Sequence, residues 1–154
     1  MSTEKDSLKI QQAAQLKVMD LLAVRTHTEK ELRQKLATHF SAEEFVDEIV
    51  EEAIGFAREK KYLEDPDTLA QRWAETLHRR NKGIEFINSY LEQKGLPSVP
   101  MNSQQEYEKA LLVIKEKYND DHKFSEEEKG RIGRMLTSRG FDSETVRKVL
   151  HEKL

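Results

Sequence analysis

The sequence predicts an all-helical protein without a β-sheet. Only six Gly and three Pro interrupt its 154 residues, and these two residue types disfavour helices most strongly. No segment of strand length alternates Val, Ile or Thr with polar residues, which is the pattern of a half-buried strand. Charged residues and apolar residues each make up 36% of the chain. This balance favours thin layers of amphipathic helices.

Helix starts are marked by a recurring pair of residues. Ser or Thr followed three residues later by Glu can form a capping box, in which each residue's side chain accepts a hydrogen bond from the other's backbone N–H. The pairs are Thr28 with Glu31, Ser41 with Glu44, Ser103 with Glu106, and Ser125 with Glu128. Asp65-Pro66 adds an acidic cap followed by proline at the first helical position, where its missing N–H has no cost.

Glycine and asparagine mark the predicted helix ends, because both tolerate the left-handed conformation that closes a helix. Gly95 and Gly140 follow two apolar periodic segments, and Asn81 and Asn119 stand near the ends of two others. Joining starts to ends predicts helices over 7–25, 29–38, 42–60, 66–80, 84–94, 104–118, 126–138 and 143–152. Their connections are short, so sequential helices must pack on one another.

An internal repeat links three of these helices. Each carries two apolar residues four positions apart, then a turn and a third apolar residue: Leu32, Leu36 and Phe40; Ile87, Leu91 and Leu96; Ile132, Leu136 and Phe141. The sets recur at intervals of 55 and 45 residues, the length of a three-helix unit. We therefore predict three tandem three-helix repeats, over residues 1–63, 64–103 and 104–154, that form an elongated, curved helical array.

The middle repeat is predicted to be irregular. The segment Leu96-Pro97-Ser98-Val99-Pro100 falls where its third helix should begin. Proline disfavours helix both for itself and for the residue before it. We expect this third helix to be lost, shortened or merged into the helix that starts near Ser103.

Several functional classes are disfavoured by what the sequence lacks. It has no Cys, which removes disulfides, thiolate nucleophiles and Cys-based zinc sites. The first residues lack the apolar core of a signal peptide and no run reaches roughly 20 apolar residues, so we expect neither export nor membrane insertion. Glu75 and His78 have the spacing of a di-iron motif, but the second such motif is missing. We expect a cytoplasmic binding protein that is not an enzyme and that needs no metal, cofactor or catalytic residue.

Charge is distributed unevenly along the sequence. The net charge of -3 argues against a protein that coats nucleic acid by bulk attraction. Residues 43–52 contain acids and no base, whereas residues 129–139 contain bases and no acid. Opposite faces are therefore expected to serve different partners, although a solvated helix face is the simpler explanation of the acidic run.

A first basic group lies at the end of the predicted helix 66–80. It consists of Arg72, Arg79, Arg80 and Lys82. Its last members directly precede a helix start near Gly83, where backbone N–H groups and guanidinium groups together suit a phosphate or a carboxylate. The alternative is an ordinary solvated helix end.

A second basic group lies along the predicted helix 126–138 and at its end. It consists of Lys129, Arg131, Arg134 and Arg139. Arg131 and Arg134 are three residues apart and therefore neighbours on the helix surface. The group is a candidate for phosphate binding; the alternative is charge balance against the acids at 126–128.

Four segments follow one family pattern in order and spacing. Residues 21–36, LLAVRTHTEKELRQKL, are similar to LLxxRxHSxxELxxKL, and residues 62–65, YLED, are similar to a GYLDD turn. Residues 83–96 resemble GxxxIxxELxxKGI, and residues 139–141, RGF, match the motif that introduces the last helix. Together they resemble the RecX family of bacterial proteins that regulate the RecA recombinase.

The resemblance implies a modular helical protein that binds, as a monomer, in the deep groove of the RecA filament on single-stranded DNA. There it would block filament extension and suppress ATP hydrolysis, strand exchange and co-protease activity in recombinational repair and the SOS response. The family usually has Arg-Phe-Ala at 68–70 and basic residues at 88–89, where this chain has Thr-Leu-Ala and Asn-Ser. These departures predict weak binding to single-stranded DNA alone. The alternative function is a stand-alone helix-turn-helix DNA-binding protein that uses residues 126–152.

Overall fold

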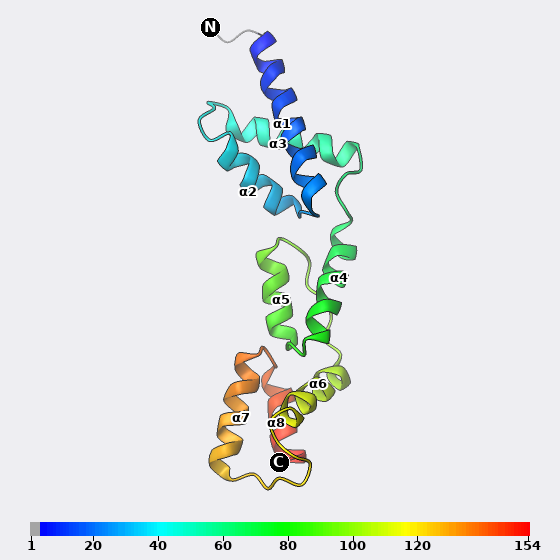
Figure 1. Ribbon diagram of the computed structural model, residues 1–154, viewed down its shortest axis with the longest axis vertical. Coiled ribbons are helices and arrows are strands. Elements are labelled where there is room, and N and C mark those ends of the chain that lie inside the picture. Colours follow the sequence, from blue (N-terminus) through cyan, green and yellow to red (C-terminus); the bar gives the residue numbers. More distant parts are fainter. Residues whose placement is uncertain (1–3) are drawn as a thin grey trace. The chain divides into compact units, whose positions relative to one another are not determined.

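The computed structural model describes residues 4–154, which form eight helices and no strand (Figure 1). The all-helical prediction is confirmed. The helices are α1 (Glu4–Val24), α2 (Glu29–His39), α3 (Val46–Glu59), α4 (Pro66–Arg79), α5 (Ile84–Gln93), α6 (Ser103–Lys115), α7 (Glu126–Ser138) and α8 (Ser143–Glu152). The chain divides into two compact units, residues 1–68 and 69–154. No helix within residues 4–154 is long and apolar enough to cross a membrane.

Two of the predicted capping boxes form. The Thr28 hydroxyl accepts a hydrogen bond from the Glu31 N–H at 3.1 Å, and the Glu31 carboxylate accepts from the Thr28 N–H at 3.2 Å. Ser125 and Glu128 make the same reciprocal pair at 3.1 and 3.2 Å. The Asp65 carboxylate also accepts from the Thr68 N–H at 3.1 Å, as expected of an acidic cap.

The other two capping boxes were predicted wrongly. α3 begins at Val46 instead of residue 42, because the chain turns back from the buried Phe40 through a hydrogen-bonded turn at Glu43. α6 is capped by Asn102, whose side chain accepts from the Gln105 N–H at 3.0 Å. Glu106, the expected partner of the Ser103 cap, is buried and binds elsewhere.

The predicted helix ends hold at three of four positions. Gly95, Gly140 and Asn81 adopt the left-handed conformation, with φ of 73°, 95° and 57°. α6 ends at Lys115, before Asn119. Lys61 adopts the left-handed conformation, with φ of 59°, just after α3, whose end at Glu59 lies one residue before the predicted end at 60.

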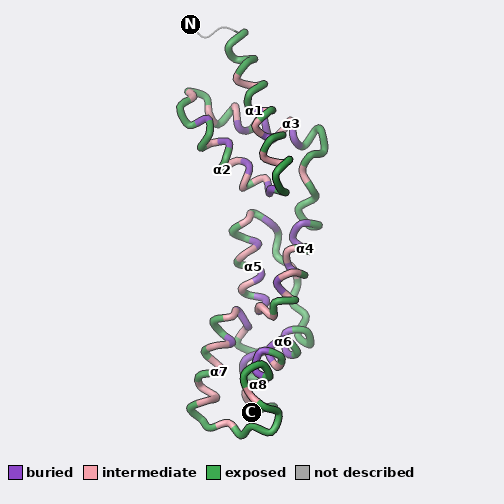
Figure 2. The backbone as a smooth tube through the Cα atoms, viewed as in Figure 1, coloured by how far each residue is buried: buried purple, intermediate pink, exposed green. Residues whose placement is uncertain are grey.

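The first unit is a three-helix unit in which α1, α2 and α3 enclose one apolar core. The predicted pair Leu32 and Leu36 is fully buried there, together with Val18 of α1 and Ile54 of α3. Full burial of such a side chain contributes about 1.5–3 kcal/mol. Figure 2 marks buried residues on each of these helices, between exposed ones.

The second unit contains α4 from Leu69 onward, α5 to α8, and two apolar clusters. One joins α4 and α5 and includes the predicted pair Ile87 and Leu91; the other joins α6, α7 and α8 and includes Ile132 and Leu136. All four side chains are buried. The repeated apolar pattern is thus confirmed, while the domain boundaries at residues 63 and 103 stay a prediction.

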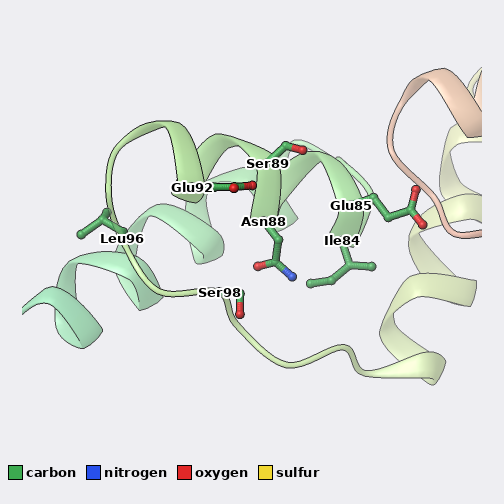
Figure 3. Close-up of a pocket in the computed structure, with 7 residues that line it drawn as sticks. All are labelled: Ile84, Glu85, Asn88, Ser89, Glu92, Leu96 and Ser98. Atoms are coloured by element: carbon green, nitrogen blue, oxygen red, sulfur yellow. The ribbon is translucent and has the colours of Figure 1, made fainter. Parts of the chain in front are cut away.

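The middle repeat has lost its third helix, as one of the sequence-based alternatives proposed. Residues 96–102 form an extended segment, which Asn88 of α5 holds by two hydrogen bonds. The Asn88 amide donates to the Val99 carbonyl at 3.1 Å, and the Val99 N–H donates to the Asn88 side-chain oxygen at 2.8 Å. Figure 3 shows the Asn88 side chain directed toward this segment.

Candidate partner-binding surface

The start of α5 meets the end of α7 within the second unit (Figure 1). The Gly83 N–H donates to the Arg139 carbonyl at 3.0 Å, and the Glu85 N–H donates to the Gly140 carbonyl at 2.9 Å. The Ile84 N–H donates to the Glu106 carboxylate at 2.7 Å. These three donors of α5 therefore already have acceptors within the chain. These backbone N–H groups are therefore not available to the anion that the sequence analysis expected at this helix start.

Glycine is required on both sides of this junction. A Cβ atom added to Gly83 would lie 2.2 Å from the Gly140 carbonyl carbon. A Cβ atom added to Gly140 would lie 2.3 Å from the Phe86 Cβ, and the φ of 95° at Gly140 is also unfavourable for other residues. The close approach of the two backbones thus explains why both turns contain glycine.

A buried ion pair lies beside the junction and was not foreseen. Lys109 and Glu106, one turn apart on α6, are only 5% and 0% exposed, and they pair with each other. The Lys109 ammonium also donates to the Lys82 carbonyl at 2.6 Å and lies 2.8 Å from Nδ1 of His78. These contacts join α4, the α4–α5 turn and α6. The only sequence signal was a Glu and a Lys on the apolar side of α6.

Burial lowers the pKa of two bases in this cluster. It lowers the pKa of Lys109, and the neighbouring Glu106 carboxylate opposes that shift. Burial and the Lys109 charge together lower the pKa of His78. Neutral His78 can therefore accept a hydrogen bond from Lys109, and the cluster serves to hold the helices together.

Three of the four members of the first basic group, on α4 and just beyond its end, are exposed. Arg72, Arg79 and Arg80 are exposed, and the Arg79 guanidinium donates to the Glu75 carbonyl at 3.3 Å. Lys82 is half-buried, with its ammonium 4.8 Å from the centre of the Phe86 ring. Arg79 and Arg80 can thus meet a partner, while Lys82 is partly engaged within the chain.

Two members of the second basic group line a shallow apolar hollow of about 450 Å³ between α7 and α8. Lys129 and Arg134 line it, and Val146 and Leu150 contribute apolar surface. The Arg134 guanidinium lies 3.4 Å from where a Cβ on Gly130 would stand, so glycine leaves room for it. The structure therefore brings Lys129 and Arg134 together.

Two further members of this group lie outside the hollow. Arg131 is exposed on α7, and Arg139 is half-buried at the junction, where its carbonyl accepts from Gly83. Its backbone therefore lies beside the turn that carries the first group. Within residues 4–154, no carboxylate forms an ion pair with Arg80, Arg131 or Arg134. These guanidinium groups can bind a carboxylate or a phosphate.

A separate hollow of about 700 Å³ lies between α5 and the extended segment (Figure 3). Its lining includes Glu85, Ser89 and Glu92, and none of the predicted basic residues. Within residues 4–154, no three His, Asp or Glu side chains come close enough to hold a metal ion. The predicted basic residues thus remain the candidates for partner binding.

The packed helical units and their repeated apolar pattern define a helical-repeat protein. The family described as RecX, third three-helix domain, matches residues 104–150. Regulatory protein RecX of Escherichia coli (strain SMS-3-5 / SECEC) is 30% identical over 166 residues, covering 96% of this chain and 96% of that protein. The chain belongs to the RecX family, which confirms the resemblance seen in its motifs.

Other relatives and solved structures agree with this assignment. Regulatory protein RecX of Yersinia enterocolitica is 26% identical over 159 residues, covering 88% of this chain and 95% of the relative. The crystal structure of RecX from Lactobacillus salivarius has a TM-score of 0.74 at 17% identity, covering 94% of this chain and 97% of that chain. A second structure, of a regulatory protein RecX, has a TM-score of 0.71 at 20% identity. The two structures support the fold.

Proposed function

We propose that this protein binds the RecA filament on single-stranded DNA and reduces RecA activity. The affected activities are ATP hydrolysis, filament extension, strand exchange and co-protease activity, in recombinational repair and the SOS response. Membership of a family whose relatives are named regulatory protein RecX supports the proposal. We further propose that the protein acts in the cytoplasm as a monomer.

The observation that carries the proposal is the concentration of the candidate bases in the second unit. They are Arg72, Arg79, Arg80, Lys82, Lys129, Arg131, Arg134 and Arg139. We propose that these residues contact filament carboxylates or DNA phosphates, because guanidinium and ammonium groups suit both. Arg80, Arg131 and Arg134 are the strongest candidates, because they are exposed and have no ion-pair partner among residues 4–154.

The overall charge favours a filament over free DNA as the target. The net charge is -3, so long-range attraction to a phosphate backbone is absent. A filament adds protein surface to the phosphates, and the apolar hollow beside Lys129 and Arg134 suits such mixed contacts. Binding to single-stranded DNA alone is therefore expected to be weak.

The last helix does not favour the alternative of a stand-alone helix-turn-helix protein. α8 exposes Arg147 and Lys148, but Glu144 and Glu152 are exposed on the same helix. A recognition helix needs bases that reach the major groove without such repulsion from phosphates. Binding of duplex DNA with sequence preference, in the absence of RecA, would favour this alternative instead.

The direct test is a titration into RecA of the same organism on single-stranded DNA while ATP turnover is followed. We expect suppression at substoichiometric amounts of the protein. A regulator that stops filament growth at one end need not occupy every subunit. An unchanged rate with the protein in molar excess over RecA would contradict the proposed function.

A further inference from the structure

We propose that a groove between α1 and α3 of the first unit binds a basic amphipathic helix of a partner protein. This site lies on the unit that carries none of the proposed filament contacts. The inference does not rest on RecA regulation. It rests on the shape, the apolar floor and the charge of the groove.

The groove has an apolar floor that the fold leaves open. A hollow of about 380 Å³ lies between the first turns of α1 and the start of α3, and Ile10, Phe45 and Ile49 line it. Phe45 is 61% exposed although it directly precedes α3. Ile10 and Ile49 are half-buried. The floor can therefore bury apolar side chains of an occupant.

The rim of the same hollow is acidic. Its carboxylates are Asp6, Glu43, Glu44, Glu48 and Glu52, and none of the described residues that line it is a Lys or Arg. Glu52 already accepts a hydrogen bond from Gln11 across the groove. Within residues 4–154, Glu43, Glu44 and Glu48 form no ion pair. Their charges remain to be compensated by bases of an occupant.

A second hollow lies next to the first along α1 and α3, and the hydrogen-bonded Gln11 and Glu52 line both. It has a volume of about 360 Å³, also shares Ile49 with the first, and extends to Phe56 and Glu59. Gly55 lines this part, and a Cβ added there would meet no atom within 4 Å. An elongated space suits a helix better than a small cation.

The chemistry of the groove selects among macromolecular partners. Its carboxylates repel nucleic-acid phosphates and acidic segments. Its apolar floor favours a ligand with apolar side chains on one face, as in the docking of an amphipathic helix into a groove. Lys and Arg beside that face would then contact the acidic rim. An occupant with both features is a basic amphipathic helix.

The test uses a fluorescein-labelled synthetic helix with Leu on one face and Lys and Arg on its flanks. Fluorescence anisotropy measures its binding to the full chain, without RecA or DNA. We expect binding that weakens about tenfold or more in the rim variant Glu44→Lys/Glu48→Lys, because both charge contacts become repulsive. The floor variant Phe45→Ser should also weaken binding. A peptide with Glu in place of Lys and Arg should not bind.

Matched controls separate the groove from general attraction to an acidic protein. Asp120→Lys/Asp121→Lys makes the same change in charge at exposed positions between α6 and α7, and Leu112→Ser removes another exposed apolar side chain. Both controls should bind within about twofold of the parent, since neither touches the groove. Equal weakening in rim and control variants would overturn the proposal.

A second readout places the peptide without relying on the charge variants. The chain has one Trp, so Trp73→Phe/Phe45→Trp puts a single fluorophore at the groove. We expect its emission to shift to shorter wavelength when the basic peptide covers it. Peptide binding with no change in this emission would overturn the site, as would the absence of any binding by the folded parent. If sedimentation shows dimers without peptide, and the Trp placed at position 45 already emits at shorter wavelength, the occupant is a second copy of this chain instead.

Discussion

In the first unit, charged side chains link the helices at the surface, whereas in the second unit they do so in the interior. Arg33 pairs with Glu51 at 2.7 Å and Arg58 pairs with Glu29 at 2.6 Å, all on partly exposed side chains. In the second unit, Glu106 and Lys109 are buried, and Glu106 also accepts from the start of α5. The two units differ because the start of α5 depends on hydrogen-bond acceptors from α6 and the turn after α7, whereas the first three helices close their own core.

A repeat with all three helices can close its own core. α1, α2 and α3 do so, and surface pairs add little to such a core. The middle repeat lacks a third helix. The N-cap and first residues of its α5 donate hydrogen bonds to Arg139 and Gly140, in the turn after α7, and to Glu106 of α6. The second unit is thus more sensitive to changes at a few interior positions.

The largest predicted effect is at the junction of α5 and α7. Gly140→Ala should lower the free energy of unfolding by about 4 kcal/mol, because left-handed strain and overlap with Phe86 add together. Urea unfolding followed by circular dichroism measures this loss. The matched change Gly55→Ala, in the open middle of α3, should instead raise stability by roughly 0.5–1 kcal/mol. Similar effects of the two substitutions would contradict the proposed tight junction.

The next effect compares the buried and the exposed charges. Lys109→Met should destabilise the chain by about 3 kcal/mol, because it leaves Glu106 buried without its cation. Arg33→Ala should cost less than about 1 kcal/mol. Urea unfolding of both variants checks the contrast. If the Arg33 variant loses as much as the Lys109 variant, the two units do not differ as described.

The extended segment that replaces the missing helix gives a smaller effect. Asn88→Ala removes both hydrogen bonds to Val99 and should cost about 1–2 kcal/mol. Hydrogen exchange of the Val99 amide should become faster, because its acceptor is gone. Ser89→Ala, at the exposed next position of α5, is the matched control. Unchanged protection of Val99 in the Asn88 variant would show that another contact holds the segment.

The smallest effect is a dependence of stability on pH. Burial, reinforced by the Lys109 charge, lowers the pKa of His78 from its ordinary value of 6.5. As pH falls below 6.5, the unfolded chain therefore takes up the proton first. Neutral His78 makes its full contribution to the free energy of unfolding above pH 6.5, and this contribution is lost as pH falls toward the lowered pKa. His78→Asn should reduce the loss in thermal unfolding between about pH 7 and 5, and the exposed control His39→Asn should not.

The sequence predicted the parts of the fold that depend on near neighbours. The caps at Thr28 and Ser125 and the apolar pair Leu32 and Leu36 need only helical spacing, and all of them form. The cap at Ser103 failed because Glu106 binds the Ile84 N–H, 22 residues away in the chain. Local patterns cannot reveal a contact of that separation.

The candidate site was only partly predictable for the same reason. Residue types and runs identified the bases, but the fold decides which of them lie together. Lys129 and Arg134 share a hollow because α8 packs beside Gly133. Arg139 lies beside the first basic group only through the hydrogen bond between its carbonyl and Gly83. The acceptors that occupy the start of α5 were likewise invisible before the chain was folded.

The central proposal is that bases of the second unit bind the RecA filament, and charge reversal tests it most directly. The two variants are Arg79→Glu/Arg80→Glu/Lys82→Glu and Lys129→Glu/Arg131→Glu/Arg134→Glu. A matched control reverses three exposed lysines of the first unit, Lys9, Lys30 and Lys60. Circular dichroism first establishes that each variant is folded.

Binding to RecA filaments on single-stranded DNA is then measured across salt concentrations for the parent and the three variants. We expect at least one second-unit variant to bind about tenfold more weakly and with a shallower salt dependence, because the contacts that made binding salt-sensitive are gone. The first-unit control should bind within about twofold of the parent. If both second-unit variants are folded and bind like the parent at every salt concentration, the proposed surface is wrong.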